Sequence, residues 1–401
     1  MNGPVCRRTL PALFYSLVTV YHCRTPLVFA AAFLSLVAAR AQGAAGATDA
    51  LPAPPELEPI SWVAFGSAQV GFGFRDNVLL SHSGEERSSF VRGGVDATAW
   101  RVPQGRVDYL AVVSAAGTRY FSAKTINKEA QAIVLSEWRY RIGDMFRFSV
   151  DGRGYYFDQI YDSSDSELQQ LVTEVKTSGA SVGPKVRWSP RTWWWVEGQG
   201  NGKREIYPDG INNRSVRDAT LRLGWKPGKR VEASVAGTEV RRGYDRREQV
   251  SVSGRQLLGT VLRIAESEVE GRLNLTLGSA GQWKTITRAA LLRFSDNGEG
   301  YLDYRRSKLA QELEWTGGDW LVAVEGSVRR IKFAVQTVGF GIAPPPRIRD
   351  DVALNVRIER QLSARWTAYA EYMWERNRSN DPLASYSMNE GLLGLRWNWE
   401  K

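Results

Sequence analysis

Apolar and polar residues alternate with a period of two along most of the chain from residue 61 onward. In the segment 352–359, one set of alternate positions is apolar: Val352, Leu354, Val356 and Ile358. The positions between them carry Ala353, Asn355, Arg357 and Glu359. Because successive side chains of a β-strand point to opposite faces, this period predicts strands with one apolar and one polar face.

Short and long connections alternate strictly between these segments. The short turns are rich in Gly, Pro, Asp and Ser, as tight turns are, and lie at 102–106, 142–144, 189–191, 226–229, 278–281, 316–319 and 361–364. The long connections are polar and lie at 75–88, 122–129, 158–169, 203–216, 241–256, 295–307, 336–350 and 376–387. Outer-membrane barrels have short periplasmic turns and long extracellular loops, whereas a soluble β-sandwich or propeller needs no such asymmetry. We therefore predict an all-β fold, a transmembrane antiparallel up-and-down β-barrel of about sixteen strands, over residues 61–401.

The positions of the tryptophans favour the same fold. Of the 15 tryptophans, only Trp374 lies toward a long loop, and the others lie near a short turn or an end of the predicted barrel. Ordinary core tryptophans would be spread along the strands. In a bilayer, indole rings gather at the headgroup level, so we expect an aromatic girdle at the periplasmic rim.

The N-terminal residues have the features of an export signal. Arg7, Arg8 and Arg24 precede an apolar stretch over 26–39, and Ala39-Arg40-Ala41 fits the small-x-small cleavage rule. We predict a signal peptide over 1–41, with a membrane anchor that is never cleaved as the alternative. Residues 42–60 are rich in Ala, Gly and Pro and are predicted to be a flexible lead-in. These features predict a location in the cell outer membrane, with membrane lipid and the barrel-assembly machinery as partners.

Few residues are available for catalysis or metal binding. Cys6 and Cys23 lie within the predicted signal peptide, and His82 is the one histidine beyond it. The mature chain therefore has no thiolate zinc site, disulfide or thiol nucleophile. A hydrolase would need His82 beside a carboxylate and a nucleophile, and the acidic segments 162–167 and 296–299 match no full calcium-loop spacing. We predict no enzyme activity, no cofactor and no metal site.

Two segments resemble a known family. Residues 69–81, Gln-Val-Gly-Phe-Gly-Phe-Arg-Asp-Asn-Val-Leu-Leu-Ser, and 90–95, Phe-Val-Arg-Gly-Gly-Val, are similar to the opening of the β-barrel porin 2 family. The segments 376–380 and 386–389, before the Trp-rich last strand, resemble its closing region. The resemblance implies an outer-membrane protein, often linked with the export of envelope polysaccharide or exopolysaccharide, and it brings no catalytic residues.

The polar faces of the predicted strands carry both signs of charge. They do not form the one-sign stripe of a nucleic-acid surface, so no nucleic-acid partner is expected. A mixed-charge face suits a water-filled lumen, and about sixteen strands are enough to enclose one. The residues predicted to line the lumen are Arg92, Asp96, Arg147, Asp151, Arg153, Lys185, Arg187, Glu197, Arg222, Glu270, Arg272, Glu325, Arg357, Glu359, Glu371 and Arg396.

The predicted function is a passive outer-membrane channel for polar or anionic solutes. The formal net charge is +10, or +6 without the four arginines of the predicted signal peptide, and rings of charged side chains set the selectivity of a pore. The family resemblance favours exopolysaccharide export over a general diffusion porin. A structural or adhesive barrel with a plugged lumen is the other alternative, because the Pro-rich segment Ala343-Pro-Pro-Pro346 could fold inward as a constriction or stand outward.

Overall fold

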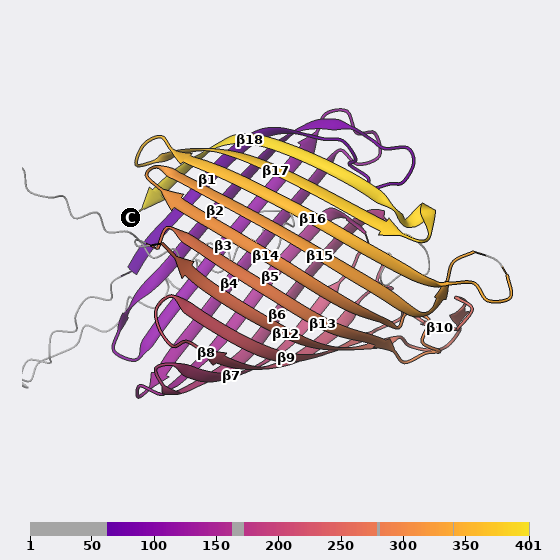
Figure 1. Ribbon diagram of the computed structural model, residues 1–401, viewed down its shortest axis with the longest axis horizontal. Coiled ribbons are helices and arrows are strands. Elements are labelled where there is room, and N and C mark those ends of the chain that lie inside the picture. Colours follow the sequence, from indigo (N-terminus) through magenta and orange to yellow (C-terminus); the bar gives the residue numbers. More distant parts are fainter. Residues whose placement is uncertain (1–61, 163–171, 279–280, 340, 401) are drawn as a thin grey trace, which may run out of the picture.

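The computed structural model describes residues 62–162, 172–278, 281–339 and 341–400. These residues form one closed antiparallel barrel of sixteen strands, with a separate two-stranded hairpin (Figure 1). The predicted signal peptide (1–41) and lead-in (42–60) lie outside the described residues. Within the described ranges, no helix has the length and hydrophobicity needed to cross a membrane.

Each barrel strand pairs with its neighbours along the chain, and β1 pairs with β18 to close the barrel. The barrel strands are β1 (Trp62–Arg75), β2 (Ser88–Gln104), β3 (Val107–Tyr120), β4 (Lys128–Ile142), β5 (Phe146–Asp162), β6 (Val172–Arg191), β7 (Trp194–Ile206), β8 (Arg214–Trp225), β9 (Val231–Tyr244), β12 (Arg263–Leu277), β13 (Trp283–Asp296), β14 (Tyr304–Gly317), β15 (Trp320–Thr337), β16 (Pro346–Gln361), β17 (Trp366–Ser379) and β18 (Tyr386–Glu400). The hairpin, β10 (Gln249–Val250) and β11 (Gln256–Leu257), lies in the connection between β9 and β12.

The long connections are mostly shorter than predicted, because the strands continue into them. The predicted loop 203–216 is reduced to 207–213, and the predicted loop 336–350 is reduced to 338–345. Polar composition suggested loops at these positions. However, a strand that leaves the bilayer can be polar on both faces while its backbone ladder continues.

Large apolar side chains cover the outer face of the barrel. Leu221, Leu291 and Leu393 are 64%, 67% and 68% exposed, although each belongs to a strand whose alternate residues are less accessible. In water such a surface would be unfavourable, whereas in a bilayer it contacts hydrocarbon. The predicted fold class and outer-membrane location are confirmed: the chain is an outer-membrane β-barrel with short turns at one end and longer loops at the other.

The predicted aromatic girdle is present, but two tryptophans do not belong to it. Exposed indole rings at the short-turn end are Trp62, Trp138, Trp188, Trp193, Trp225, Trp283, Trp320, Trp366 and Trp397. In contrast, Trp100 lies on the inner face, where its Nε1 donates a hydrogen bond to Asp108 Oδ1 at 2.9 Å. Trp195 is only 6% exposed and also lies inside. The position of a tryptophan close to a short turn correctly predicted the rim at which it lies. Whether it points outward or inward depends on whether its position in the strand is odd or even, because successive side chains point to opposite faces.

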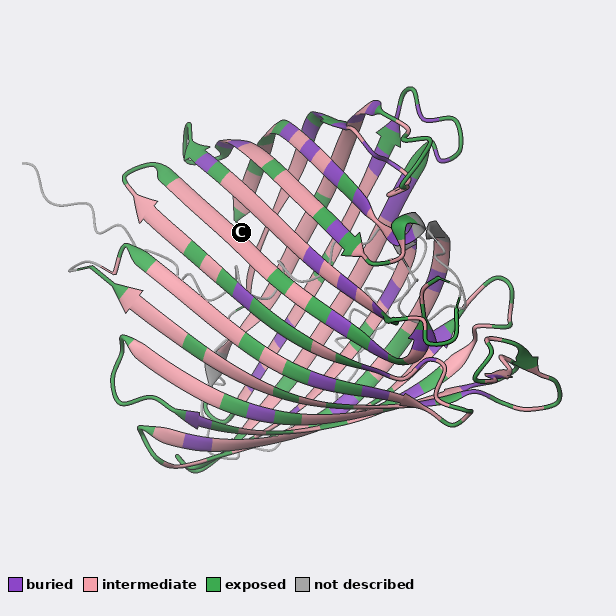
Figure 2. Cartoon of the chain, turned by 45° about the vertical axis from the view of Figure 1, so that its right-hand side comes forward, coloured by how far each residue is buried: buried purple, intermediate pink, exposed green. Residues whose placement is uncertain are grey.

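Among the described residues, the two clusters of buried apolar side chains on the inner face lie mainly toward the loop end of the barrel. Phe90 and Tyr120 pack with Val78 from the connection between β1 and β2. A second cluster joins Phe294 to Leu302 from the connection between β13 and β14. Figure 2 shows such buried positions alternating with exposed ones along the strands. The remaining inner wall is therefore the part where charged side chains can meet water.

Candidate functional site: the charged inner wall

The strand register places all sixteen predicted lumen residues on the face opposite the apolar belt. Several of them lie directly opposite each other on adjacent strands: Arg147 and Arg187, Arg187 and Glu197, Glu197 and Arg222, and Arg357 and Glu371. The exposed residues Val186, Leu221 and Leu223 occupy alternate positions of the same strands. The period of two therefore separates the lipid-facing and lumen-facing residues along the strands.

Three arginines lie side by side on the inner wall near the short-turn end. Arg141 of β4 is opposite Arg147 of β5, which is opposite Arg187 of β6. We refer to these three residues as the arginine row. Like charges directly opposite each other destabilise a sheet, so this arrangement has a cost unless an anion or water screens it. Neighbouring strands are about 4.8 Å apart, which brings the three guanidinium groups within reach of one multivalent anion.

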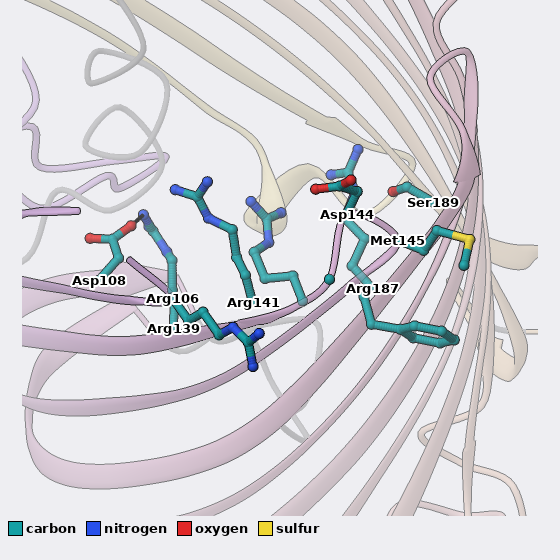
Figure 3. A pocket seen from close by; sticks show the side chains of 11 residues that line it. Arg106, Asp108, Arg139, Arg141, Asp144, Met145, Arg187 and Ser189 are labelled. Carbon is teal, nitrogen blue, oxygen red and sulfur yellow. Dashed lines mark hydrogen bonds and ion pairs between the residues drawn. The ribbon is translucent and has the colours of Figure 1, made fainter. Parts of the chain in front are cut away.

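The arginine row lines a cavity of about 400 Å³ at this end of the barrel (Figure 3). The other lining residues are Arg106, Asp108, Arg139, Gly143, Asp144, Met145, Phe146 and Ser189. Figure 3 shows Arg106, Arg139 and Arg141 close to one another in this lining. Five arginines face only two acids in this lining, so the cavity carries an excess of positive charge. A charged concave wall concentrates ions of opposite sign.

The arginines of this cavity differ in how far they are neutralised. Arg139 forms ion pairs with Asp108 at 3.2 Å and with Glu137 at 2.5 Å. Arg187 is 3.9 Å from Glu197, at the limit of an ion pair. Within the described part of the chain, Arg141 and Arg147 have no carboxylate within 4.0 Å. Both are exposed, so their charges are available to a solute.

An aromatic contact positions the third member of the arginine row. The guanidinium carbon of Arg187 lies 3.8 Å from the ring centroid of Trp195, a cation–π arrangement. Trp195 lies flat against Gly224 of β8, where an added Cβ would come within 2.1 Å of the indole. Gly224 therefore makes room for Trp195, and Trp195 holds Arg187.

Elsewhere on the inner wall, on β1, β2 and β16–β18, arginines are buried against carboxylates. Glu390 of β18 accepts hydrogen bonds from Arg75 at 2.7 Å and from Arg92 at 2.6 Å. These three side chains are 5–11% exposed, and we call them the buried ion-pair cluster. A neighbouring network joins Arg357 and Arg396 to Glu359, and Arg357 also to Glu371. Five predicted lumen residues are thus engaged with each other or with Glu390 and are not free to bind a solute.

The other predicted residues have looser surroundings. Lys185 is 3.5 Å from Glu137, and Arg222 is 3.9 Å from Glu270. Asp96 accepts a hydrogen bond from Ser114 at 2.6 Å, and Arg272 donates one to Asn274 at 3.0 Å. Glu325 lies opposite Glu312 and Asn355 on the neighbouring strands. Asp151 and Arg153 follow Arg147 on the same face of β5, in the direction of the loop end. These residues are distributed around the wall and do not form a single site.

Sequence reasoning missed Arg139 and Arg141 in the cavity. The available signal was parity: Trp138 and Tyr140 alternate with these arginines, and Trp138 is exposed on the outer face. An arginine between two girdle aromatics must point inward. Lys308, which lies opposite Arg329, was also missed; it directly follows the segment 295–307 that was predicted as a loop.

Of the two acidic segments considered for calcium, 296–299 makes local hydrogen bonds, and 162–167 lies outside the described residues except for Asp162. Asp296 Oδ1 accepts hydrogen bonds from the amides of Gly298 and Gly300, and Glu299 accepts one from Val252. His82 is exposed in the connection between β1 and β2. In the Pro-rich connection, Ile342 is fully exposed, and the connection extends beyond the end of the barrel (Figure 1). That orientation argues against this segment as a plug.

Comparisons with known proteins found similarity to solved structures alone, at low identity. No protein-family model and no curated protein matches the chain, so membership of the β-barrel porin 2 family stays a prediction. Similar solved structures include OmpT, an outer-membrane protein of Vibrio cholerae, with 12% identity and a TM-score of 0.43 over 84% of this chain and 97% of that chain. OccAB1 of Acinetobacter baumannii has 8% identity and a TM-score of 0.46, covering 84% of this chain and 96% of its own. A bacterial polysaccharide outer membrane secretin has 10% identity and a TM-score of 0.43, covering 84% and 98%. At such low similarity, the interpretation of the lumen depends on this chain's own residues.

Proposed function

We propose that the barrel is a passive, non-enzymatic channel for polar and anionic solutes, and that the arginine row attracts the anions. The observation that carries this proposal is the exposure of Arg141 and Arg147 without a neutralising carboxylate among the described residues. Barrels of this strand number enclose water, and fixed charges along such a lumen set ion selectivity.

The size of the effect follows from Coulomb's law. An anion that passes about 8 Å from one fixed charge in water is stabilised by about 0.5 kcal/mol. Three charges then contribute about 1.5 kcal/mol, which corresponds to roughly a tenfold enrichment of anions relative to an uncharged solute. This weak attraction spread over several groups permits passage, whereas a single tight site would hold the solute.

Single-channel recording in planar bilayers tests the proposal. The purified parent protein is expected to conduct and to prefer anions in a salt gradient. Arg141→Gln, Arg147→Gln and Arg187→Gln together should abolish most of that preference. Lys229→Gln, Arg230→Gln and Arg365→Gln together remove three exposed cations from other short-turn positions and serve as the control. A non-conducting parent protein, or unchanged selectivity in the arginine-row variant, would contradict the proposal.

The position of the arginine row favours export as the second, finer candidate. The row lies at the short-turn end, which faces the periplasm in an outer-membrane barrel. Anions are therefore concentrated where a solute leaving the cell would enter the channel. We propose an acidic polysaccharide as the exported solute, in line with the family resemblance.

A deletion strain distinguishes export from uptake. Export predicts a loss of secreted acidic polymer and normal uptake of small anions, with polymer restored by the parent gene but not by the arginine-row variant. Impaired uptake with normal secretion would reject export and leave the channel itself intact. The bilayer recordings decide separately whether the protein conducts.

A further inference from the structure

A second row of cations lies on the outer surface of the barrel. Arg293 of β13 is opposite Arg305 of β14, and Arg305 is opposite Lys332 of β15. All three side chains are exposed, and they alternate with the buried, inward-facing Phe294, Tyr304 and Phe333. They therefore point away from the lumen, near the ends of the strands that lead to the longer loops.

We call Arg293, Arg305 and Lys332 the outer row. No acidic residue lies directly opposite any of them on the neighbouring strands. Ser267 of β12 lies opposite Arg293 at one end, and Ile348 of β16 lies opposite Lys332 at the other. Among the described residues, none of the three cations has a carboxylate within 4.0 Å. One outward position nearer the membrane on β15, Arg330 does pair with Asp350 at 2.8 Å, so neutralisation on this face was possible but is absent from the row.

Apolar side chains lie one or two outward positions from the outer row, on its membrane side. Leu291, Leu309 and Val328 face outward on the same three strands and are 67%, 50% and 48% exposed. Leu309 is opposite Val328 in the ladder. The surface of β13–β15, which lie side by side in Figure 1, thus changes from apolar to cationic within one or two outward positions. Such a boundary matches an amphiphile whose acyl chains lie along the apolar residues and whose anionic headgroup lies above them.

We propose that Arg293, Arg305 and Lys332 form a binding site for the phosphate of a phosphorylated lipid in the outer leaflet. The longer loops mark the extracellular end, so the row lies at the level of the outer-leaflet headgroups. Adjacent strands are about 4.8 Å apart, so a phosphate between two of them can accept hydrogen bonds from both. A free anion would gain the charge contact but not the contact with Leu291, Leu309 and Val328. This site is separate from the lumen and does not depend on channel activity.

Native mass spectrometry of the full-length protein tests the site, with bisphosphorylated lipid A as the probe and its dephosphorylated form for comparison. The variant Arg293→Gln, Arg305→Gln and Lys332→Gln should bind lipid A on the order of 100-fold more weakly, since each cation near an anionic lipid contributes about 1 kcal/mol. The control variant Lys229→Gln, Arg230→Gln and Arg365→Gln removes the same charge from exposed short-turn positions and should bind like the parent.

Further measurements make the result decisive. Circular dichroism should show that both variants keep the barrel, because the substituted side chains are exposed and outside the apolar belt. Weaker binding of the dephosphorylated lipid to the parent would support the site. Equal binding of both lipids, an unaffected outer-row variant, or displacement of lipid A by millimolar inorganic phosphate would overturn it.

Discussion

The arginine row and the buried ion-pair cluster use the same residue type on the same inner wall for opposite purposes. Arg75 and Arg92 of the cluster are about 10% exposed and share Glu390, which is 5% exposed. Arg141 and Arg147 of the row are exposed and lie opposite each other, with no carboxylate within 4.0 Å in the described residues. The comparison shows that pairing and burial, more than the presence of charge, separate structural arginines from those able to bind a solute.

The two regions also differ in where they lie along the barrel. The buried ion-pair cluster lies toward the loop end, where Tyr120 and Glu129 pack beside it and the Tyr120 hydroxyl donates to Glu129 at 2.6 Å. The arginine row lies at the short-turn end beside an open cavity. A buried charge needs its partner, whereas an exposed one is stabilised by water. Mutations should therefore affect stability in the first region and selectivity in the second.

The largest expected effect is the loss of stability on Glu390→Gln. This change leaves Arg75 and Arg92 buried without their shared carboxylate, which costs about 3–5 kcal/mol. Reversible urea unfolding in detergent micelles would measure the difference. The control is Glu314→Gln, which breaks the more exposed 2.7 Å pair with Lys284 and should cost less than about 1 kcal/mol. Equal effects of the two variants would mean that burial does not distinguish these pairs.

A smaller loss of stability is expected for Gly224→Ala. The added Cβ would meet the Trp195 indole at 2.1 Å, so the ring must shift at a cost of about 1–3 kcal/mol. Because Trp195 supports Arg187, the anion preference of the channel should fall as well. Gly198→Ala of β7 is the control, since an added Cβ there has no neighbour within 4 Å. A shift in stability with unchanged selectivity would show that Trp195 does not position Arg187.

These two regions also show what the sequence can and cannot predict. Alternation identified the inner face of the strands, including Arg92, Arg147 and Arg187, because parity is a local property. Pairing is not local: Arg92 meets Glu390 from the far end of the chain when β1 and β18 close the barrel. The register of Arg141, Arg147 and Arg187 likewise depends on where the short turns end. The sixteen residues predicted to line the lumen therefore include both buried, ion-paired side chains and side chains that a solute can reach.

A modest gain of selectivity is expected for Glu197→Gln. Glu197 is the acid nearest Arg187, at 3.9 Å, so its neutralisation makes the arginine row more positive. One charge at about 8 Å in water corresponds to about 0.5 kcal/mol, or roughly a twofold increase in the enrichment of anions relative to an uncharged solute. Reversal potentials in a salt gradient measure this change. A decrease in anion preference would show that Glu197 supports Arg187 more than it neutralises it.

The smallest expected effect concerns the loops over the buried ion-pair cluster, and it depends on pH. The Thr125 hydroxyl donates to Glu86 Oε1 at 2.6 Å, and this bond holds the pKa of Glu86 below its usual range. The amides of Lys124 and Thr125 donate to the same carboxylate at 3.0 and 3.3 Å, which joins two connections at the loop end.

Because the folded form of Glu86 has the lower pKa, the contact stabilises the loops above the unfolded value of about 4.3 and is lost as the pH falls through the folded value. Hydrogen-exchange protection factors of the Lys124 and Thr125 amides should therefore decrease on acidification to about pH 3. Glu86→Gln should reduce their protection at neutral pH, whereas Glu85→Gln, at an exposed neighbouring position, should not. Protection that is independent of pH in the parent protein would mean that the loop end is held by its apolar packing around Val78 alone.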